Sequence, residues 1–198
     1  MNARLVLVRH TRPAVGVEIC HGRTDLALAP SWRGDVAACL ARIPRATRVL
    51  TSPSNRCRRL ARAIGVRDAA PVQIDDRLQE LDFGSWEGRA WSEIPRDGVD
   101  RWAADLLNFA PGDGESLRAL WARLSRWREE VLEGCVGDVV VVSHHGPIRA
   151  LFAQVCGQPP ERMFTRRIPW GGVLCVDLGV PVPLPSRDHG AAAHRSPR

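Results

Sequence analysis

The chain has 198 residues, of which 44% are hydrophobic and 25% are charged, a composition typical of one globular domain. Its formal net charge is +6, and all 28 basic residues are arginine because the sequence contains no lysine. This excludes a Walker-type phosphate-binding loop and a Schiff-base lysine, and the arginines form no nucleic-acid-binding tract. We therefore expect a small anionic substrate and no nucleic-acid partner.

The sequence also indicates the compartment. No apolar run approaches the roughly 20 residues that cross a bilayer, and the N-terminus lacks the pattern of a signal peptide, so we expect a cytoplasmic protein without a membrane partner. The cysteines are scattered without a C-x-x-C pair, which indicates reduced thiols rather than a disulfide framework or a zinc knuckle. They are Cys20, Cys39, Cys57, Cys135, Cys156 and Cys175.

Predicted strands and helices alternate along the chain. Short apolar runs predict strands at 5–8, 48–52, 71–75, 137–143 and 172–178, and helical spacing of apolar residues predicts helices at 31–43, 54–64, 115–133 and 147–155. The intervening 84–114, rich in Trp, Pro, Gly and Asp, is expected to hold at most two short helices. Alternating strands and helices predict an α/β fold with a mostly parallel sheet covered on both faces. We expect one domain at 1–179 and a Pro-rich, disordered tail at 180–198.

Polar residues follow these strands. Arg9 and His10 end the first strand, Arg56 lies in the first turn of the helix after the second, and the sequence SHHGP at 143–147 follows the fourth. Glu80 comes shortly after the third. Each residue alone could be an ordinary surface or core residue, but ligands of an open α/β sheet bind at the carboxyl ends of its strands. Their joint placement therefore predicts a site.

Phosphoryl transfer suits these residue types. Arg9 and Arg56 can each bind phosphate oxygens with two N–H groups, and Gly146-Pro147 suits a helix start whose N–H groups face the same anion. Nearby guanidinium groups favour a neutral, nucleophilic His10. Beside a phosphate dianion Glu80 can serve as a general acid toward the leaving alcohol. This chemistry requires no metal or other cofactor.

The motifs RHT at 9–11, SPSNRCRRLA at 52–61, LQELDFGSWEG at 78–88 and VVVSHHGPIRAL at 140–151 together resemble the histidine phosphatase, or phosphoglycerate mutase-like, superfamily. The resemblance implies a three-layer α/β/α sandwich with a mostly parallel central sheet. It implies that His10 is the phosphorylated nucleophile and Glu80 the proton donor. It further implies that Arg9, Arg56 and His144 hold the phosphate.

The segment ICHGRTDLALAPS at 19–31 makes the chain most similar to the alpha-ribazole phosphatase branch, which acts in assembly of the cobalamin nucleotide loop. This implies alpha-ribazole 5'-phosphate as substrate, with a loop carrying His21, Gly22 and Arg23 over the phosphate. Thr11 and His145, also expected to bind substrate, replace glycines that are usual in the family. Gly16 lies near the position where many members carry a phosphate-binding Asn.

Several alternatives stay open at this point. A broad-specificity phosphatase is one, and a mutase is another, although only Arg89, Arg96 and Arg101 between Glu80 and the long helix could hold a second phosphate. A phosphohistidine protein phosphatase and a phospho-ligand-binding pseudoenzyme are two more. A metal site formed by His10, His21 and His144 matches no common zinc spacing. A homodimer is also possible.

Overall fold

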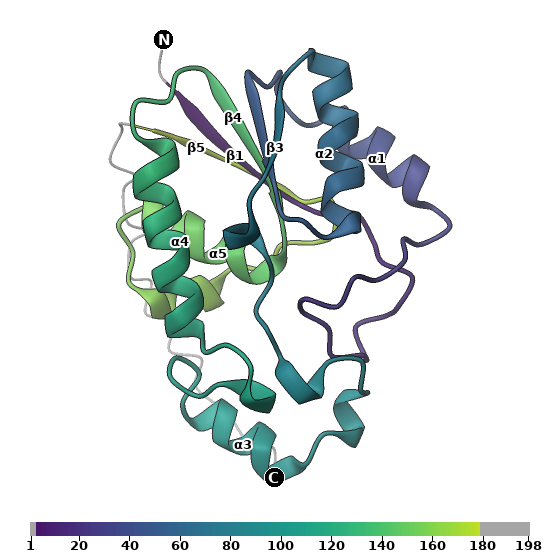
Figure 1. Cartoon of the computed structure of the whole chain (residues 1–198), viewed down its shortest axis with the longest axis vertical. Coiled ribbons are helices and arrows are strands. Elements are labelled where there is room, and N and C mark those ends of the chain that lie inside the picture. Colours follow the sequence, from purple (N-terminus) through teal and green to yellow (C-terminus); the bar gives the residue numbers. More distant parts are fainter. Residues whose placement is uncertain (1–2, 179–198) are drawn as a thin grey trace, which may run out of the picture.

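A five-stranded sheet with the strand order β3-β2-β4-β1-β5 forms the centre of the molecule (Figure 1). The computed structural model describes residues 3–178, so the predicted tail at 180–198 lies outside the described residues. The strands are β1 (Arg4–Arg9), β2 (Arg48–Thr51), β3 (Val72–Ile74), β4 (Asp138–Ser143) and β5 (Val173–Asp177). The first four pair in parallel, and β5 pairs antiparallel with β1. The predicted mostly parallel sheet is confirmed.

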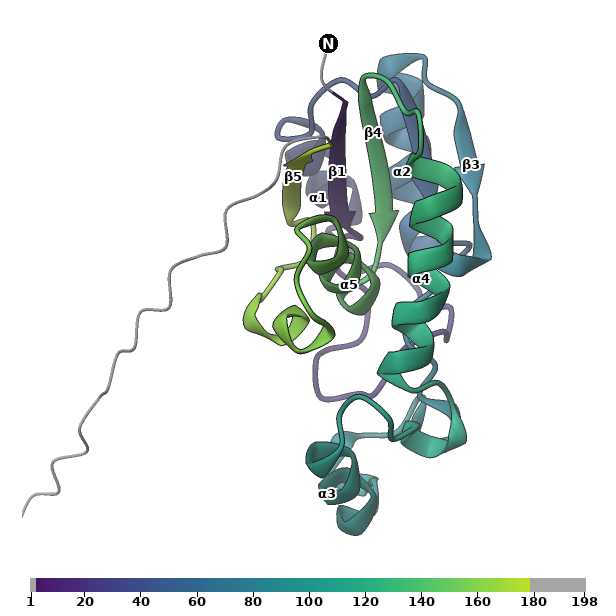
Figure 2. The ribbon, with the colours of Figure 1, turned by 90° about the vertical axis from the view of Figure 1, so that its left-hand side faces the viewer.

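Two helical layers cover the sheet, as Figure 2 shows. On one face Val6 and Val8 of β1 pack against α1 (Trp32–Leu40) and α2 (Asn55–Asp68). On the other face the alternate residues Leu5 and Leu7 pack against α4 (Leu117–Leu132) and α5 (His145–Val155). A strand buried on both faces must be apolar at every position, which explains the unbroken apolar runs. The three-layer arrangement matches the expected sandwich.

Helix α2 is a full turn longer than the predicted 54–64 and ends at Asp68. Gly65 therefore lies inside the helix, although glycine disfavours a helix interior. In the structure a Cβ at Gly65 would lie 2.4 Å from a methyl carbon of Val72, so glycine lets β3 pack closely against the helix. Ala69, the residue after the helix, caps its C-terminus in a left-handed backbone conformation with φ of 52°.

The segment 84–114 forms a small lobe at one end of the molecule, where Figure 1 shows α3 (Arg96–Ala104) far from the sheet. It contains one α-helix and the short 3-10 turns Gly84–Trp86, Trp91–Glu93 and Pro111–Asp113. A separate apolar cluster holds the lobe together, with Cys20, Trp86 and Ile94 buried at its centre. None of the helices in residues 3–178 combines the length and apolarity needed to cross a membrane.

Candidate active site

A cavity of about 430 Å³ lies at the carboxyl ends of the parallel strands. It brings together seven of the residues singled out from the sequence, namely Arg9, His10, His21, Arg56, Glu80, His144 and His145. Its remaining walls are mainly aromatic and aliphatic, formed by Val17, Ile19, Leu81, Phe83, Trp91, Trp102, Leu106, Leu117, Met163, Phe164 and Trp170, with Gly146 and Arg149. The cavity therefore has a polar floor at the sheet and an apolar wall toward the lobe.

His10 follows β1 and is only 3% exposed. Its Nδ1 lies 2.7 Å from the carbonyl oxygen of Thr11, which can only accept, so Nδ1 carries the ring proton and Nε2 keeps its lone pair. Burial, and then the charge of Arg56, hold the pKa of His10 well below its usual value of 6.5. The imidazole is therefore neutral at pH 7 and nucleophilic at Nε2.

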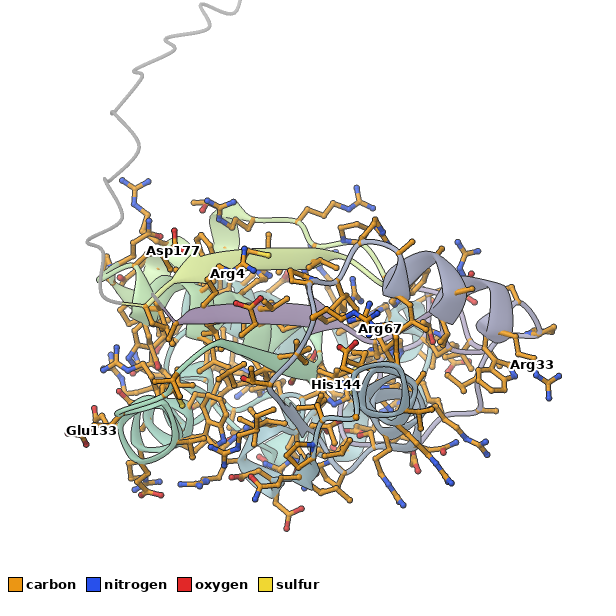
Figure 3. The ribbon with its side chains drawn as sticks, turned by 90° about the horizontal axis from the view of Figure 1, so that it is seen from above. Arg4, Arg33, Arg67, Glu133, His144 and Asp177 are labelled. Atoms are coloured by element: carbon orange, nitrogen blue, oxygen red, sulfur yellow. The ribbon has the colours of Figure 1, made fainter. Side chains whose placement is uncertain are left out.

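His144 is fully buried beside the nucleophile candidate, and Figure 3 shows it in the interior while Arg33 and Glu133 lie at the periphery. The ring centroids of His10 and His144 are 5.1 Å apart. The Nε2 of His144 lies 2.8 Å from the hydroxyl oxygen of Ser52, a contact that follows directly from β2 pairing with β4. Burial and Arg56 hold its pKa well below the usual range, so His144 is also neutral.

Arg9 and Arg56 are positioned by backbone carbonyls rather than by carboxylates. The Nη atoms of Arg56 donate to the carbonyls of Thr24 (2.6 Å) and Gly22 (2.5 Å), and Arg9 Nη1 donates to Ile168 O at 2.6 Å. Within residues 3–178 neither forms an ion pair, and the Nε of each is buried without a hydrogen-bond partner. Because a buried cation is costly unless an anion compensates it, this arrangement is suited to binding an anion in the cavity.

Glu80 occupies the N-terminus of α5. Its carboxylate accepts from the N–H of Gly146 at 3.1 and 3.2 Å and from the N–H of Leu81 at 3.0 Å. The helix begins at His145, two residues before the predicted start at Pro147. The prediction that the Gly146 N–H binds the substrate anion is therefore wrong for this structure, because that N–H donates to the carboxyl group of Glu80.

Three residues expected to bind substrate do not line the cavity. Arg23 is drawn away by ion pairs with Asp82 (3.3 Å) and Glu115 (3.4 Å). Gly22 contributes to the site only through its backbone carbonyl, which accepts a hydrogen bond from Arg56. A Cβ at this position would lie 1.9 Å from the carbonyl oxygen of Leu81, so the close packing requires glycine. Thr11 is buried and contributes its carbonyl to His10.

Sequence reasoning missed the segment 163–172, which carries no motif but ties several site residues together. The carbonyl of Ile168 accepts from Arg9, the N–H of Gly171 donates to His10 O at 3.0 Å, and Arg9 N donates to Gly172 O at 3.0 Å. The Trp170 ring lies 5.4 Å from the guanidinium of Arg9. Arg149 was also missed, although its spacing of four residues from His145 on one helix was a usable signal.

The aromatic wall comes from the lobe. Trp91 and Trp102 stack with ring centroids 6.1 Å apart and planes 5° apart, and Phe83 meets both edge to face at 5.8 Å. These rings line the cavity together with the polar residues.

The metal alternative finds no support in the described part of the chain. No group of three or more His, Cys, Asp or Glu among residues 3–178 has the arrangement of a metal site.

The neutral histidines predict loss of stability in mild acid. The folded pKa values of His10, His144 and His145 are lowered, so below pH 6.5 the unfolded chain binds more protons than the folded one. We expect urea unfolding to show stability falling as pH drops from 6.5 to 5, by about 1.4 kcal/mol per pH unit for each such histidine. His145→Gln should make this slope shallower, and a slope that is flat in the unsubstituted protein would contradict the burial of these rings.

Known proteins similar to this chain in sequence and fold provide the comparison. The chain is 27% identical over 183 residues to the adenosylcobalamin/alpha-ribazole phosphatase of Salmonella typhimurium, covering 88% of this chain and 90% of the relative. It is 31% identical over 172 residues to the glucosyl-3-phosphoglycerate phosphatase of Mycolicibacterium vanbaalenii, covering 80% and 76%. The crystal structure of the alpha-ribazole phosphatase from Shigella flexneri superposes with a TM-score of 0.79 at 26% identity, covering 88% and 90%.

Other relatives are longer proteins. The chain matches mycobacterial proteins, among them a bifunctional protein of Mycobacterium tuberculosis, at 35% identity, and the match spans only 43% of their length. The family model described as histidine phosphatase superfamily (branch 1) matches residues 5–179. That match includes the whole sheet apart from Arg4, the first residue of β1, and every residue that lines the cavity. The chain therefore belongs to branch 1 of the histidine phosphatase superfamily.

Proposed function

We propose that the protein is a metal-independent phosphomonoesterase that works through a phosphohistidine intermediate. The observation that carries this proposal is a neutral His10, with its Nε2 lone pair free, in one cavity with two guanidinium groups that have no ion-pair partner among the described residues. A dianionic phosphate supplies the negative counter-charge that the guanidinium groups of Arg9 and Arg56 do not find among the described residues. The same anion is thereby placed beside the nucleophile.

The reaction proceeds in two displacements. In the first, Nε2 of His10 attacks phosphorus, the ester P–O bond breaks, and Glu80 gives its proton to the leaving oxygen. In the second, water attacks the phosphorus, Glu80 takes the proton from that water, and the P–N bond breaks to release inorganic phosphate. Arg9, Arg56 and the neutral His144 donate hydrogen bonds to the equatorial oxygens, on which negative charge is spread in both transition states.

We further propose alpha-ribazole 5'-phosphate as the substrate, with dephosphorylation in cobalamin nucleotide-loop assembly as its role. The names of the Salmonella and Shigella relatives support this, as does the wall of Phe83, Trp91 and Trp102, which suits a flat aromatic base. The relative from Mycolicibacterium acts on a different phosphate ester, so a broad-specificity phosphatase is the second candidate.

The mutase alternative is less well supported. Arg89, Arg96 and Arg101, the arginines available for a second phosphate, do not line the cavity. Arg89 donates to the carbonyl of Glu93, and the other two form ion pairs one turn along α3. Hydrolysis therefore agrees better with the site. A pseudoenzyme is disfavoured because both His10 and Glu80 are present in the cavity.

A substrate panel tests the proposal. With excess EDTA present, we expect release of inorganic phosphate from alpha-ribazole 5'-phosphate with a kcat/KM at least tenfold above that for 3-phosphoglycerate or a phosphohistidine peptide. Equal rates on all three would support the broad-specificity candidate instead. Transfer of phosphate between positions of phosphoglycerate would support the mutase, and loss of turnover with EDTA would refute the metal-independent mechanism.

A further inference from the structure

Arg149 and His145 form a second polar corner of the cavity, apart from the phosphate-binding arginines. The two residues are four positions apart on α5, so their side chains lie on the same face of the helix. Both line the cavity. The proposed mechanism uses neither of them.

The segment after α5 fixes the orientation of this corner. The Nε of Arg149 donates to the carbonyl of Met163, and its guanidinium lies 5.3 Å from the centre of the Phe164 ring. The N–H of Ile168 donates to Nε2 of His145 at 3.4 Å. Packing and backbone contacts thus fix both side chains without occupying all of their N–H groups.

The remaining groups of the corner are donors. The Nη atoms of Arg149 have no hydrogen-bond partner among residues 3–178, and neither has Nδ1 of His145. Burial and the nearby Arg9 and Arg149 lower the pKa of His145 to about 4, so its ring is neutral at pH 7. Because Nε2 accepts from Ile168, the ring proton is on Nδ1. The corner therefore offers N–H groups to an acceptor oxygen.

Glu80 shows which part of a substrate meets this corner. Its carboxylate is bonded to the N–H of Gly146, which lies between His145 and Arg149 on the same helix. Under the proposed function Glu80 protonates the ester oxygen, so side chains beside Glu80 are next to the first atoms of the leaving group. Arg9 and Arg56 already serve the phosphate.

The charges in the cavity indicate what kind of oxygen is bound. Its lining contains the cations Arg9, Arg56 and Arg149 and the single carboxylate of Glu80, and lowered pKa values keep its four histidines neutral. Arg9 and Arg56 together balance one phosphate dianion, so Arg149 and the uncharged ring of His145 are left for the leaving group. A hydroxyl oxygen can accept from both of these donors.

We propose that Arg149 and His145 bind hydroxyl oxygens of a sugar joined directly to the phosphate, so that the enzyme selects sugar or nucleoside phosphates. This inference rests on the proposed phosphatase function. It assigns specificity to two residues on α5, whereas the aromatic wall of the lobe contacts the more distant part of the leaving group.

The test compares ribose 5-phosphate with benzyl phosphate, which both release a primary alkoxide and so make the same demand on Glu80. In Arg149→Met we expect kcat/KM for ribose 5-phosphate to fall by about tenfold to a hundredfold, mainly through a higher KM, as for loss of a hydrogen bond to a charged group. Benzyl phosphate should change by less than about threefold. The matched control is Arg166→Met, because Arg166 also stacks on a phenyl ring, that of Phe152 at 4.1 Å, but does not line the cavity.

Equal losses on both esters would place Arg149 among the phosphate ligands and overturn the inference, as would no loss on either. A wild-type preference for 3-phosphoglycerate that Arg149→Met removes would show a carboxylate in the corner instead. If Arg149→Met does not fold, Arg149→Lys provides the same comparison, because it keeps the charge but lacks the planar fork.

Binding gives a readout that is separate from turnover. Titration of ribose 5-phosphate into His10→Ala, with and without Arg149→Met, should show the same tenfold or larger weakening. If the wild-type enzyme hydrolysed none of the esters, the proposed function would fail, while this titration would still decide for or against the sugar-binding corner.

Discussion

His10→Ala is expected to remove all measurable phosphatase activity while leaving the fold intact. The proposed mechanism makes the P–N bond at this residue the only route from ester to product, and loss of a nucleophile of this kind typically costs several orders of magnitude in kcat. The side chain that is removed is 3% exposed and forms no ion pair with a described carboxylate. It belongs to neither apolar cluster that packs on the sheet, so we expect both clusters to remain. Phosphate release and far-UV circular dichroism measure the two expectations.

A trapping experiment identifies the residue directly. Wild-type enzyme quenched during turnover of radiolabelled ester should carry a label that acid removes and base does not, in the peptide that contains His10, and His10→Ala should carry none. His189→Ala is the matched histidine control, since no role is assigned to that residue. Turnover retained in His10→Ala, or a label on another peptide, would refute the nucleophile assignment.

Glu80→Gln is expected to slow esters selectively according to their leaving group. An alkoxide must be protonated as it leaves, and a positioned general acid contributes about 10²- to 10⁴-fold, whereas p-nitrophenolate leaves without a proton. We therefore expect the rate of the first displacement to fall by about 10²- to 10⁴-fold for benzyl phosphate. For p-nitrophenyl phosphate it should fall by less than about tenfold. The amide oxygen of Gln can still accept from Gly146, so the position of the side chain is preserved.

Rapid-quench kinetics separate the two displacements. Because Glu80 also serves as the base toward water, Glu80→Gln should show a burst of p-nitrophenol followed by slow turnover, as phosphohistidine accumulates. Glu18→Gln is a suitable control, because Glu18 is exposed and does not line the cavity. Equal slowing of the first displacement for both esters would show that Glu80 is not the general acid.

The positions of His10, Arg56 and His144 could be predicted because each follows an apolar run. Buried parallel strands must be apolar throughout, so the point where polarity returns marks the edge of the sheet, and strand pairing then brings these edges together. Adjacent parallel pairing of β1 and β4 places His10 beside His144. Local sequence was sufficient here because the geometry of a sheet supplies the long-range contact.

Other parts of the site could not be predicted because they depend on irregular segments. The segment 163–172 has no periodic pattern, yet its carbonyl and N–H groups fix Arg9, His145 and Arg149. Arg23 belongs to a motif that matches the family, but its guanidinium forms ion pairs with Asp82 and Glu115 instead of facing the cavity. The spacing of residues in the sequence does not reveal such long-range ion pairs. The early start of α5 likewise depends on the Glu80 carboxylate, which comes from 66 residues away.

The antiparallel edge strand has a consequence for synthesis of the protein. The N–H of Gly171 donates to the carbonyl of His10, and the N–H of Arg9 donates to the carbonyl of Gly172. These glycines lie about 160 positions after β1 in the chain, and β5 follows them immediately. A chain emerging from the ribosome can form local helices early, but the segment that anchors the proposed nucleophile is made about 160 residues after it, and closing so long a loop is slow. We therefore expect the site to be complete only after β5 has been made and has paired with β1.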